Sequence, residues 1–335
     1  MENLNAKQLM QQAREQLDGK DSRKLAAFHT GVLAAVALGL TLMQYALSTG
    51  IGNTSGLSGL STLSILETMQ TVLQWINMIL LPFWSLGFVY AALKWSRGEY
   101  ARKEDLLTGF RRFRPYLGLT FNRLLLTICV SIISVNIGSI IYGMLPASEG
   151  LADLTAAASA GTEALYQAME QMSMEELMAL GRSLLPMMLI VLAIGALLLI
   201  PMLYRFRMAE YVILDQPGTR GLIAMLQSAA LLRRRCWQLF LVDLKFWWYY
   251  GLKILCIVLC YIDVLLRTAG VALPQNGLVY LGSYLLYLVA MFLVETCFRP
   301  VVNTSYACAY QTLKELGPIA KRPVAMPERL PEDEN

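Results

Sequence analysis

Residues 94–123 read KWSRGEYARKEDLLTGFRRFRPYLGLTFNR and hold eight Lys or Arg residues against three acids. Residues 144–181 show the opposite pattern, with six Asp or Glu residues and no Lys or Arg. A long apolar run separates the two stretches. Loops rich in Lys and Arg stay in the cytoplasm in multispan membrane proteins. The charge pattern therefore predicts a membrane protein with residues 94–115 inside and residues 144–182 outside.

The composition of the whole chain also favours a membrane protein. Its 335 residues are 56% hydrophobic and only 16% charged, whereas soluble domains are about a quarter charged. The net charge of +4 is small, and the basic residues flank apolar runs instead of sharing one solvent-exposed face. This distribution argues against nucleic-acid binding and leaves membrane lipids, anionic ones included, as the expected partners.

Six apolar stretches are close to the roughly 20 residues that a helix needs to cross a bilayer. Helices are expected because strand-like alternation is absent and unpaired backbone groups are costly in lipid. Basic residues before the first stretch and after the last place both termini in the cytoplasm. The prediction is one all-α domain over 1–320 in the cell membrane, with a helical outside loop at 144–182 and a disordered cytoplasmic tail at 321–335. The six predicted spans are 25–48, 69–93, 116–143, 183–204, 237–262 and 278–300.

Three cytoplasmic stretches carry apolar residues on one side at helical spacing, and basic residues follow each stretch. Helices of this kind lie in the headgroup plane, so we expect three interfacial amphipathic helices. Each leads into a span, which suggests one unit used three times; the alternative is that basic amphipathic segments simply flank the spans. The apolar residues are Leu9, Met10, Ala13 and Leu17; Leu106, Leu107, Phe110 and Phe113; and Leu222, Ile223, Leu226 and Ala230.

Motifs of a known family are concentrated in the last part of the chain. They are Pro201 followed by Tyr211 and VILDQP at 212–217, then QLFLVDLKFWW at 238–248, and finally Pro300 with Ala307 and Tyr310. With them the chain resembles the bacterial integral-membrane family catalogued as domain of unknown function nine-seven-five, common in Firmicutes. It is more distantly similar to the membrane domain of some glycerophosphodiester phosphodiesterases. The family has no established activity, so the resemblance implies a fold and leaves the function open.

The sequence departs from that family in two places. Lys245 stands where the family usually has a small polar residue, and the stretch 144–182 looks like an insertion.

Catalytic signatures are missing from the sequence. It holds no Walker loop, no His-Glu-x-x-His pair and no nucleophile elbow. The one histidine, His29, stands near the start of the first predicted span. We therefore expect no enzymatic activity, no cofactor and no metal site.

Ionisable residues within or beside the later spans are the best pointers to a functional site, because such residues are costly in lipid. Glu295 precedes Arg299 by four residues, the favourable order for an intrahelical pair. One interpretation is a polar pocket between the last three spans that binds an anionic headgroup or an ion. The other is snorkelling side chains and internal pairs that fix the helix ends. We expect the first four of the following to approach one another: Asp243, Lys245, Glu295, Arg299, Arg205, Arg207 and Glu210.

Small residues repeat at intervals of four on the first predicted span, at Gly31, Ala35 and Gly39. Such a stripe permits close packing of helices. It serves either packing within one molecule or association between two copies.

The leading functional hypothesis is a non-enzymatic membrane protein that organises or senses the inner leaflet or an envelope partner. A transporter of small solutes or lipids is the alternative, and a membrane enzyme comes third. A polar cavity containing Asp243 and Glu295 would favour transport, whereas tightly packed spans would favour the leading hypothesis.

Overall fold

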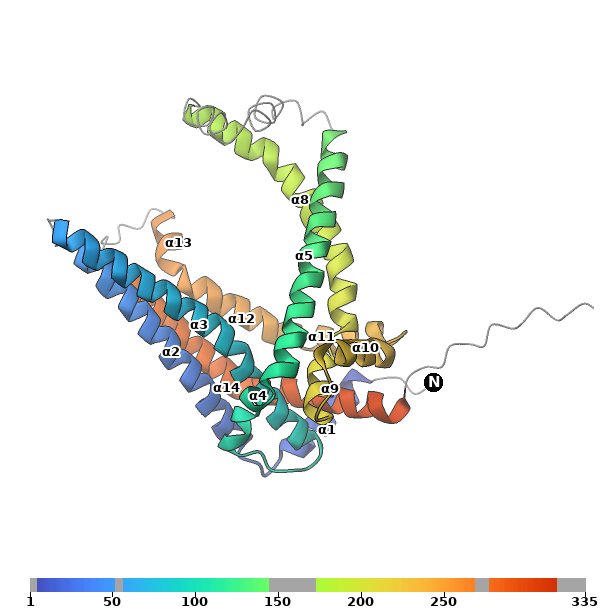
Figure 1. The fold of residues 1–335 in the computed structure, drawn as a ribbon. Helices are drawn as coiled ribbons and strands as arrows, with labels where there is room; N and C mark the ends of the chain where they lie inside the picture. Colours follow the sequence, from blue (N-terminus) through green and yellow to red (C-terminus); the bar gives the residue numbers. More distant parts are fainter. Residues whose placement is uncertain (1–4, 52–56, 145–172, 269–276, 318–335) are drawn as a thin grey trace, which may run out of the picture. The chain divides into compact units, whose positions relative to one another are not determined.

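The computed structural model describes residues 5–51, 57–144, 173–268 and 277–317, and every regular element in these ranges is a helix (Figure 1). The predicted all-α fold is confirmed to that extent. The chain forms two compact units, one from Met1–Tyr116 with Met208–Asn335 and the other from Leu117–Arg207. The prediction of a single domain stays a prediction.

Four helical segments in the described residues are long and apolar enough to cross a membrane. They contain most or all of the predicted first, third, fourth and sixth spans. The second predicted span lies within the 40-residue helix α3 (Leu57–Ser96). The four segments are Ser22–Met43, Phe113–Gly143, Leu184–Asp215 and Val279–Leu316.

The fifth predicted span is not one continuous helix. It is divided into α11 (Cys236–Lys245), α12 (Trp247–Cys260) and α13 (Ile262–Thr268). At Phe246 the backbone N–H turns to the carbonyl of Asp243, three residues back. Phe246 is fully buried, while the next residue, Trp247, is 68% exposed. A hydropathy pattern does not register such a break, because both sides of it are apolar.

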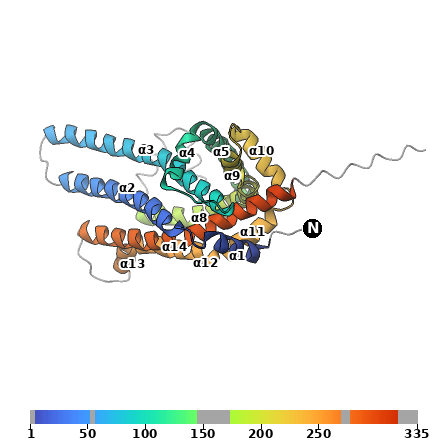
Figure 2. The ribbon, with the colours of Figure 1, turned by 90° about the horizontal axis from the view of Figure 1, so that it is seen from below.

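Helix α14 (Gly277–Leu316) is the centre of the first unit. It packs against α2 (Ser22–Ile51), α3, α12 and α1 (Ala6–Leu17), and Figure 2 shows it running between α2 and α12. Its last turns carry small buried residues, among them Ala307 and Ala309, which allow close approach. The large side chains of the first unit that are almost fully buried include Phe88, Trp95, Met208, Leu239, Phe246 and Tyr310.

The first predicted amphipathic helix forms as α1, but protein covers its apolar face. Asn5 caps the helix by accepting a hydrogen bond from the backbone N–H of Lys7 at 3.0 Å. Leu9, Ala13 and Leu17 are buried, and α1 packs against α14, α11 and α3. The apolar stripe therefore contributes to the protein core, and the expectation that it faces lipid was wrong.

The structure also differs from the prediction at the second amphipathic helix. Two short elements, η1 (Lys103–Leu107) and α4 (Thr108–Arg111), replace it. Leu106 is fully buried because its backbone lies directly against Gly87 of α3: a Cβ atom at that glycine would stand 1.8 Å from the Leu106 carbonyl oxygen. Leu107 and Phe113 of the same predicted stripe are exposed. The stripe is thus divided between core and surface, and the segment is not one continuous amphipathic helix.

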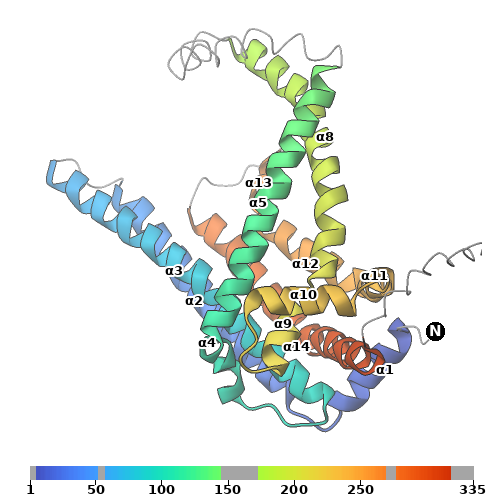
Figure 3. The same cartoon turned by 45° about the vertical axis from the view of Figure 1, so that its right-hand side comes forward.

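The third predicted amphipathic helix forms as α10 (Gly221–Leu231), which lies beside α9 (Ala209–Asp215) (Figure 3). Its predicted stripe is exposed: Leu222 is 56% and Leu226 is 62% accessible. The opposite face of α10 is buried. Only this helix keeps the predicted stripe on its outer surface among the three.

The second unit consists of parts of α5 (Phe113–Gly143) and α8 (Met174–Arg205), which meet where Gly138 contacts Val191. Most of their large apolar side chains are exposed, as at Leu197 with 74%. Exposed apolar surface of this extent requires a covering of lipid or protein.

Parts of the predicted outside loop and tail are not described. Residues 145–172 and 318–335 lie outside the described ranges, whereas residues 174–182 belong to the same helix as the fourth span. The prolines that suggested a threefold repeat, Pro82, Pro201 and Pro300, all lie inside helices. The repeat itself stays a prediction.

Candidate functional site

Glu295 of α14 is 6% exposed and is held by three side chains. Its Oε1 atom accepts from Nζ of Lys253 at 2.8 Å and from the hydroxyl of Tyr249 at 2.9 Å. Its Oε2 atom lies 3.3 Å from Nη1 of Arg299, one turn later on the same helix. Tyr249 and Lys253 are likewise one turn apart on α12, so two helical pairs face each other across the α12–α14 contact.

Arg299 extends this cluster to α2 and α3. Its guanidinium lies 4.9 Å from the ring centroid of Phe88, and its Nη1 atom is 3.4 Å from Nδ1 of His29. The Nε2 atom of His29 is 3.3 Å from the carbonyl oxygen of Trp84. A neutral ring that donates from Nε2 to the carbonyl leaves Nδ1 free to accept from Arg299.

The contacts of His29 give this residue a structural role. Its ring is fully buried and stacks on Trp84 with centroids 5.4 Å apart. The indole N–H of Trp84 returns a hydrogen bond to the carbonyl of His29 at 3.2 Å. These contacts join α2 to α3, and Arg299 joins both to α14.

The charges in this first cluster are unequal, because one carboxylate faces the two cations Lys253 and Arg299. A buried ion pair is strongly destabilised when one partner is lost, because the other charge is then left without compensation. The geometry supports internal pairing as the role of Glu295.

A second cluster surrounds Asp215, the last residue of α9, whose side chain is 6% exposed. The carboxylate pairs with Arg97 from the end of α3. From α14 it accepts hydrogen bonds from the hydroxyl of Tyr310 at 2.9 Å and from Nζ of Lys314 at 2.7 Å. Three segments that are distant in sequence thus meet at one carboxylate.

Sequence reasoning missed this second cluster, although two signals pointed to it. Asp215 belongs to the motif VILDQP and Tyr310 to the motif that follows Pro300. Tyr211 stacks on Tyr310 with ring centroids 5.6 Å apart. The family motifs could have been taken as one site instead of as separate marks of resemblance.

The four residues expected to approach one another do so only in part. The intrahelical Glu295–Arg299 pair is present, but Lys253 occupies the place expected for Lys245. Asp243 instead accepts a hydrogen bond from the hydroxyl of Tyr306. The difference arises from the break at Phe246, which separates the helix carrying Asp243 and Lys245 from the helix that faces Glu295.

The other candidate residues lie in the stretch of sequence where the chain leaves the second unit and re-enters the first. Arg205 ends α8 and is exposed, and the guanidinium of Arg207 lies 5.5 Å from the ring centroid of Tyr204. Glu210 is in the first turn of α9 and is half-buried. A headgroup-binding role for these three residues stays a prediction.

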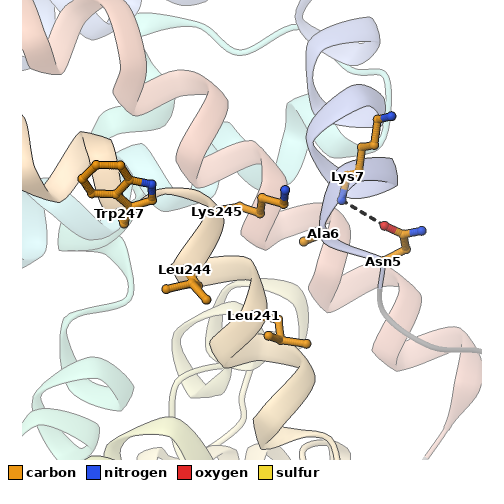
Figure 4. A pocket seen from close by; sticks show the side chains of 7 residues that line it. All are labelled: Asn5, Ala6, Lys7, Leu241, Leu244, Lys245 and Trp247. Atoms are coloured by element: carbon orange, nitrogen blue, oxygen red, sulfur yellow. Dashed lines mark hydrogen bonds between the residues drawn. The ribbon is translucent and has the colours of Figure 1, made fainter.

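Lys245 lines a pocket between α1 and α11 with a volume of about 1060 Å³ (Figure 4). Lys7 stands on the α1 side, near the start of that helix. Leu241, Leu244 and Trp247 form much of the opposite wall, with Asn5 and Ala6 completing the described lining. Two cations and three large apolar side chains thus share one opening.

Among the described residues, the small-residue stripe of α2 packs against another helix only at its first member. A Cβ atom at Gly31 would lie 3.8 Å from the ring of Phe292 in α14, whereas one at Gly39 would meet nothing within 4 Å. Ala35 is exposed. Within the described residues, no group of three or more His, Cys, Asp or Glu side chains could hold a metal ion.

The exposed surface of α10 and the arginines that follow this helix form a further candidate site. Ser228 on its buried face accepts a hydrogen bond from the backbone N–H of Met208 at 3.1 Å. Beyond its end, Arg235 donates to the carbonyl of Gly317 at 2.9 Å, while Arg233 and Arg234 are exposed. An apolar face therefore adjoins two exposed arginines.

The family model described as protein of unknown function DUF975 matches residues 4–316. The chain belongs to the DUF975 family. The resemblance inferred from the motifs around Pro201, Asp215 and Pro300 is thereby confirmed. No curated protein and no solved structure matches this DUF975 protein. The more distant similarity to the phosphodiesterase membrane domain stays a prediction.

Proposed function

We propose that this DUF975 protein is a non-enzymatic, multispan protein of the cell membrane that organises or senses anionic lipids of the inner leaflet. The observation that carries the proposal is the orientation of α10. Its inner face packs on α9, and its outer face presents Leu222, Ile223 and Leu226. Arg233 and Arg234 follow directly and are exposed.

This combination suits a helix that lies in the headgroup plane. Apolar side chains on the outer face gain about 1.5–3 kcal/mol each when they are fully removed from water, and arginines beside them are attracted to anionic headgroups. The inner face fixes the helix to the protein, so its position can report on the membrane surface. A helix held on one side by protein and on the other by lipid is a suitable sensor of lipid composition.

The proposed topology has six spans with both termini in the cytoplasm. Its support is the charge bias of 94–123 against 144–181 together with the four long apolar helices. Helix α3 supplies the second span, and α11 and α12 together supply the fifth. Helix α12 alone, with 14 residues, would extend about 21 Å and is too short to cross roughly 30 Å of hydrocarbon.

Fluorescence quenching in liposomes tests this role for α10. In a variant without native cysteines, Leu226→Cys is labelled with an environment-sensitive dye, and Gln216→Cys provides an exposed control site. We expect a lipid-borne quencher to act on position 226 and aqueous iodide to act on position 216. Adding phosphatidylglycerol should increase quenching at position 226, and Arg233→Gln with Arg234→Gln should reduce that increase. Iodide quenching of equal strength at both positions would disprove the proposal.

A transporter of lipids or small solutes is the second candidate, and the interrupted fifth span favours it. Helices broken within the membrane are common at transporter binding sites, and the break at Phe246 lies beside Asp243. Glu295 argues against a transporter, because its carboxylate is held by Tyr249, Lys253 and Arg299. Transbilayer movement of a fluorescent lipid, measured in liposomes with and without the protein, separates the two candidates. Acceleration by wild-type protein that is lost in Asp243→Asn would favour transport.

A further inference from the structure

We propose that the pocket between α1 and α11 binds the headgroup of one anionic phospholipid, with its phosphate between Lys7 and Lys245 and an acyl chain along Leu241, Leu244 and Trp247. This site rests on the proposed function, since it names the lipid class that the protein recognises. It is separate from the Glu295 and Asp215 clusters, which contribute none of the lining residues.

The charge of the lining selects an anion. The described lining contains two lysines and no acid. Lys7 and Lys245 are both exposed, and within the described residues neither forms a salt bridge or a side-chain hydrogen bond. Figure 4 shows the Lys245 side chain extending toward α1, where Lys7 stands at the start of the helix. An ammonium group binds phosphate as a compact charge with three donors.

The apolar wall selects a lipid over a soluble phosphate. Leu241, Leu244 and Trp247 are 41%, 53% and 68% exposed on one side of the pocket. Trp is enriched where the headgroups meet the hydrocarbon, because its ring is apolar and its N–H is polar. A soluble phosphate would make no contact with this wall, whereas an acyl chain attached to the bound headgroup would pack along it.

The size of the pocket fits one headgroup and the upper part of a chain. Its volume of about 1060 Å³ is slightly above the usual range of ligand sites in proteins, about 300–1,000 Å³. Its two sides come from distant parts of the chain, near Asn5 and near Leu244, and α1 packs against α11. Bound lipid would therefore also stabilise the docking of the N-terminal helix.

Native mass spectrometry of the full chain in mild detergent tests the site. Phosphatidylglycerol and phosphatidylcholine are added separately to wild-type protein, to Lys7→Gln/Lys245→Gln, and to the charge-matched control Lys24→Gln/Arg114→Gln. The control residues are exposed and line no part of the pocket. We expect phosphatidylglycerol affinity to fall about 5-fold for each lysine removed and about 25-fold for both. The control and the phosphatidylcholine affinity should change less than twofold.

Two further measurements identify the class of ligand and locate its binding site. Glycerol phosphate, which lacks acyl chains, should fail to displace phosphatidylglycerol. Trp247→Ala should lower the affinity for phosphatidylglycerol. Displacement by glycerol phosphate, with no effect of Trp247→Ala, would reveal a soluble phosphate ligand and overturn the lipid assignment. A photoactivatable phosphatidylglycerol should attach to peptides that contain Lys7 or Leu244 in wild-type protein. Attachment only elsewhere would overturn the site, as would unchanged affinity in Lys7→Gln/Lys245→Gln.

Failure of this site is distinguishable from failure of the proposed function. If position 226 of α10 is quenched from the lipid but the lysine variant binds normally, only the pocket assignment is wrong. If iodide reaches position 226 as readily as position 216, the proposed function itself is wrong.

Discussion

The hydroxyl of Tyr249 in α12 donates a hydrogen bond to Glu295 in α14 at 2.9 Å, and the two residues are only 5% and 6% exposed. Together with Lys253 and Arg299, this contact connects α12, part of the interrupted fifth predicted span, to α14, the central helix of the first unit.

Replacing Tyr249 by Phe should destabilise the protein by about 1.5–3 kcal/mol, the usual contribution of a hydrogen bond to a charged group. The change removes one oxygen and leaves the ring in place. Thermal unfolding in detergent, followed by tryptophan fluorescence, measures the effect. Tyr280→Phe is the control, since Tyr280 is 47% exposed on α14. Equal melting temperatures for the two variants would contradict the structural role of the Tyr249 hydroxyl.

Glu295→Gln should destabilise more than Tyr249→Phe, because it leaves Lys253 and Arg299 without their carboxylate. Breaking a buried pair costs about 3–5 kcal/mol. Glu295→Gln/Arg299→Gln should recover part of that loss, since only one cation then remains near the amide. The double-mutant cycle is measured by the same unfolding assay. Strict additivity of the two single changes would mean that Glu295 and Arg299 do not interact.

Asp215→Asn should loosen the junction of α9 with the ends of α3 and α14. The neutral side chain loses its ion pairs with Arg97 and Lys314, although Tyr310 can still donate to its oxygen. We expect faster hydrogen–deuterium exchange over Ala209–Asp215 than in wild-type protein. The control Glu315→Gln changes an exposed acid that directly follows Lys314 in the sequence. Exchange in Asp215→Asn that is no faster than in this control would count against the cluster.

Gly87→Ala should be severely destabilising, whereas Gly39→Ala should be neutral or slightly stabilising. A Cβ atom at position 87 would stand 1.8 Å from the carbonyl oxygen of Leu106, while position 39 has no atom within 4 Å. Alanine also favours a helix over glycine by about 1 kcal/mol where space permits. Expression level and melting temperature check both variants. Similar stability of the two variants would show that α3 and η1 can separate without cost.

The orientation in the membrane is testable with single cysteines at Met144 and Gln216, both exposed. The charge bias places position 144 outside and position 216 in the cytoplasm. In intact cells, an impermeant thiol reagent should label Met144→Cys alone, and permeabilisation should expose Gln216→Cys as well. The reverse labelling pattern would invert the proposed topology.

Local features could be predicted from the sequence because they depend on neighbours along the chain. The Glu295–Arg299 pair follows from a spacing of four on one helix, and the outward face of α10 follows from the periodicity of Leu222, Ile223 and Leu226. The choice of Lys253 over Lys245 could not be predicted. It depends on the break at Phe246, which changes the direction in which later side chains point.

Apolar periodicity shows which face of a helix avoids water, but it does not show what covers that face. Leu9, Ala13 and Leu17 in α1 and Leu226 in α10 have similar patterns, yet protein covers the first three, and Leu226 is 62% exposed. The single histidine is a similar case. His29 has no local motif, and only the packing of α2, α3 and α14 gives it the partners Trp84 and Arg299.

The sequence by itself determined the all-α class, the membrane character and the family, because hydropathy, charge bias and short motifs are properties of consecutive residues. Tertiary structure decided which charges meet. Asp215 joins Arg97, 118 residues before it, and Lys314, 99 residues after it. Such partners are selected by the packing of distant helices, since a charge is stable in a buried place only where an opposite charge arrives at the same position.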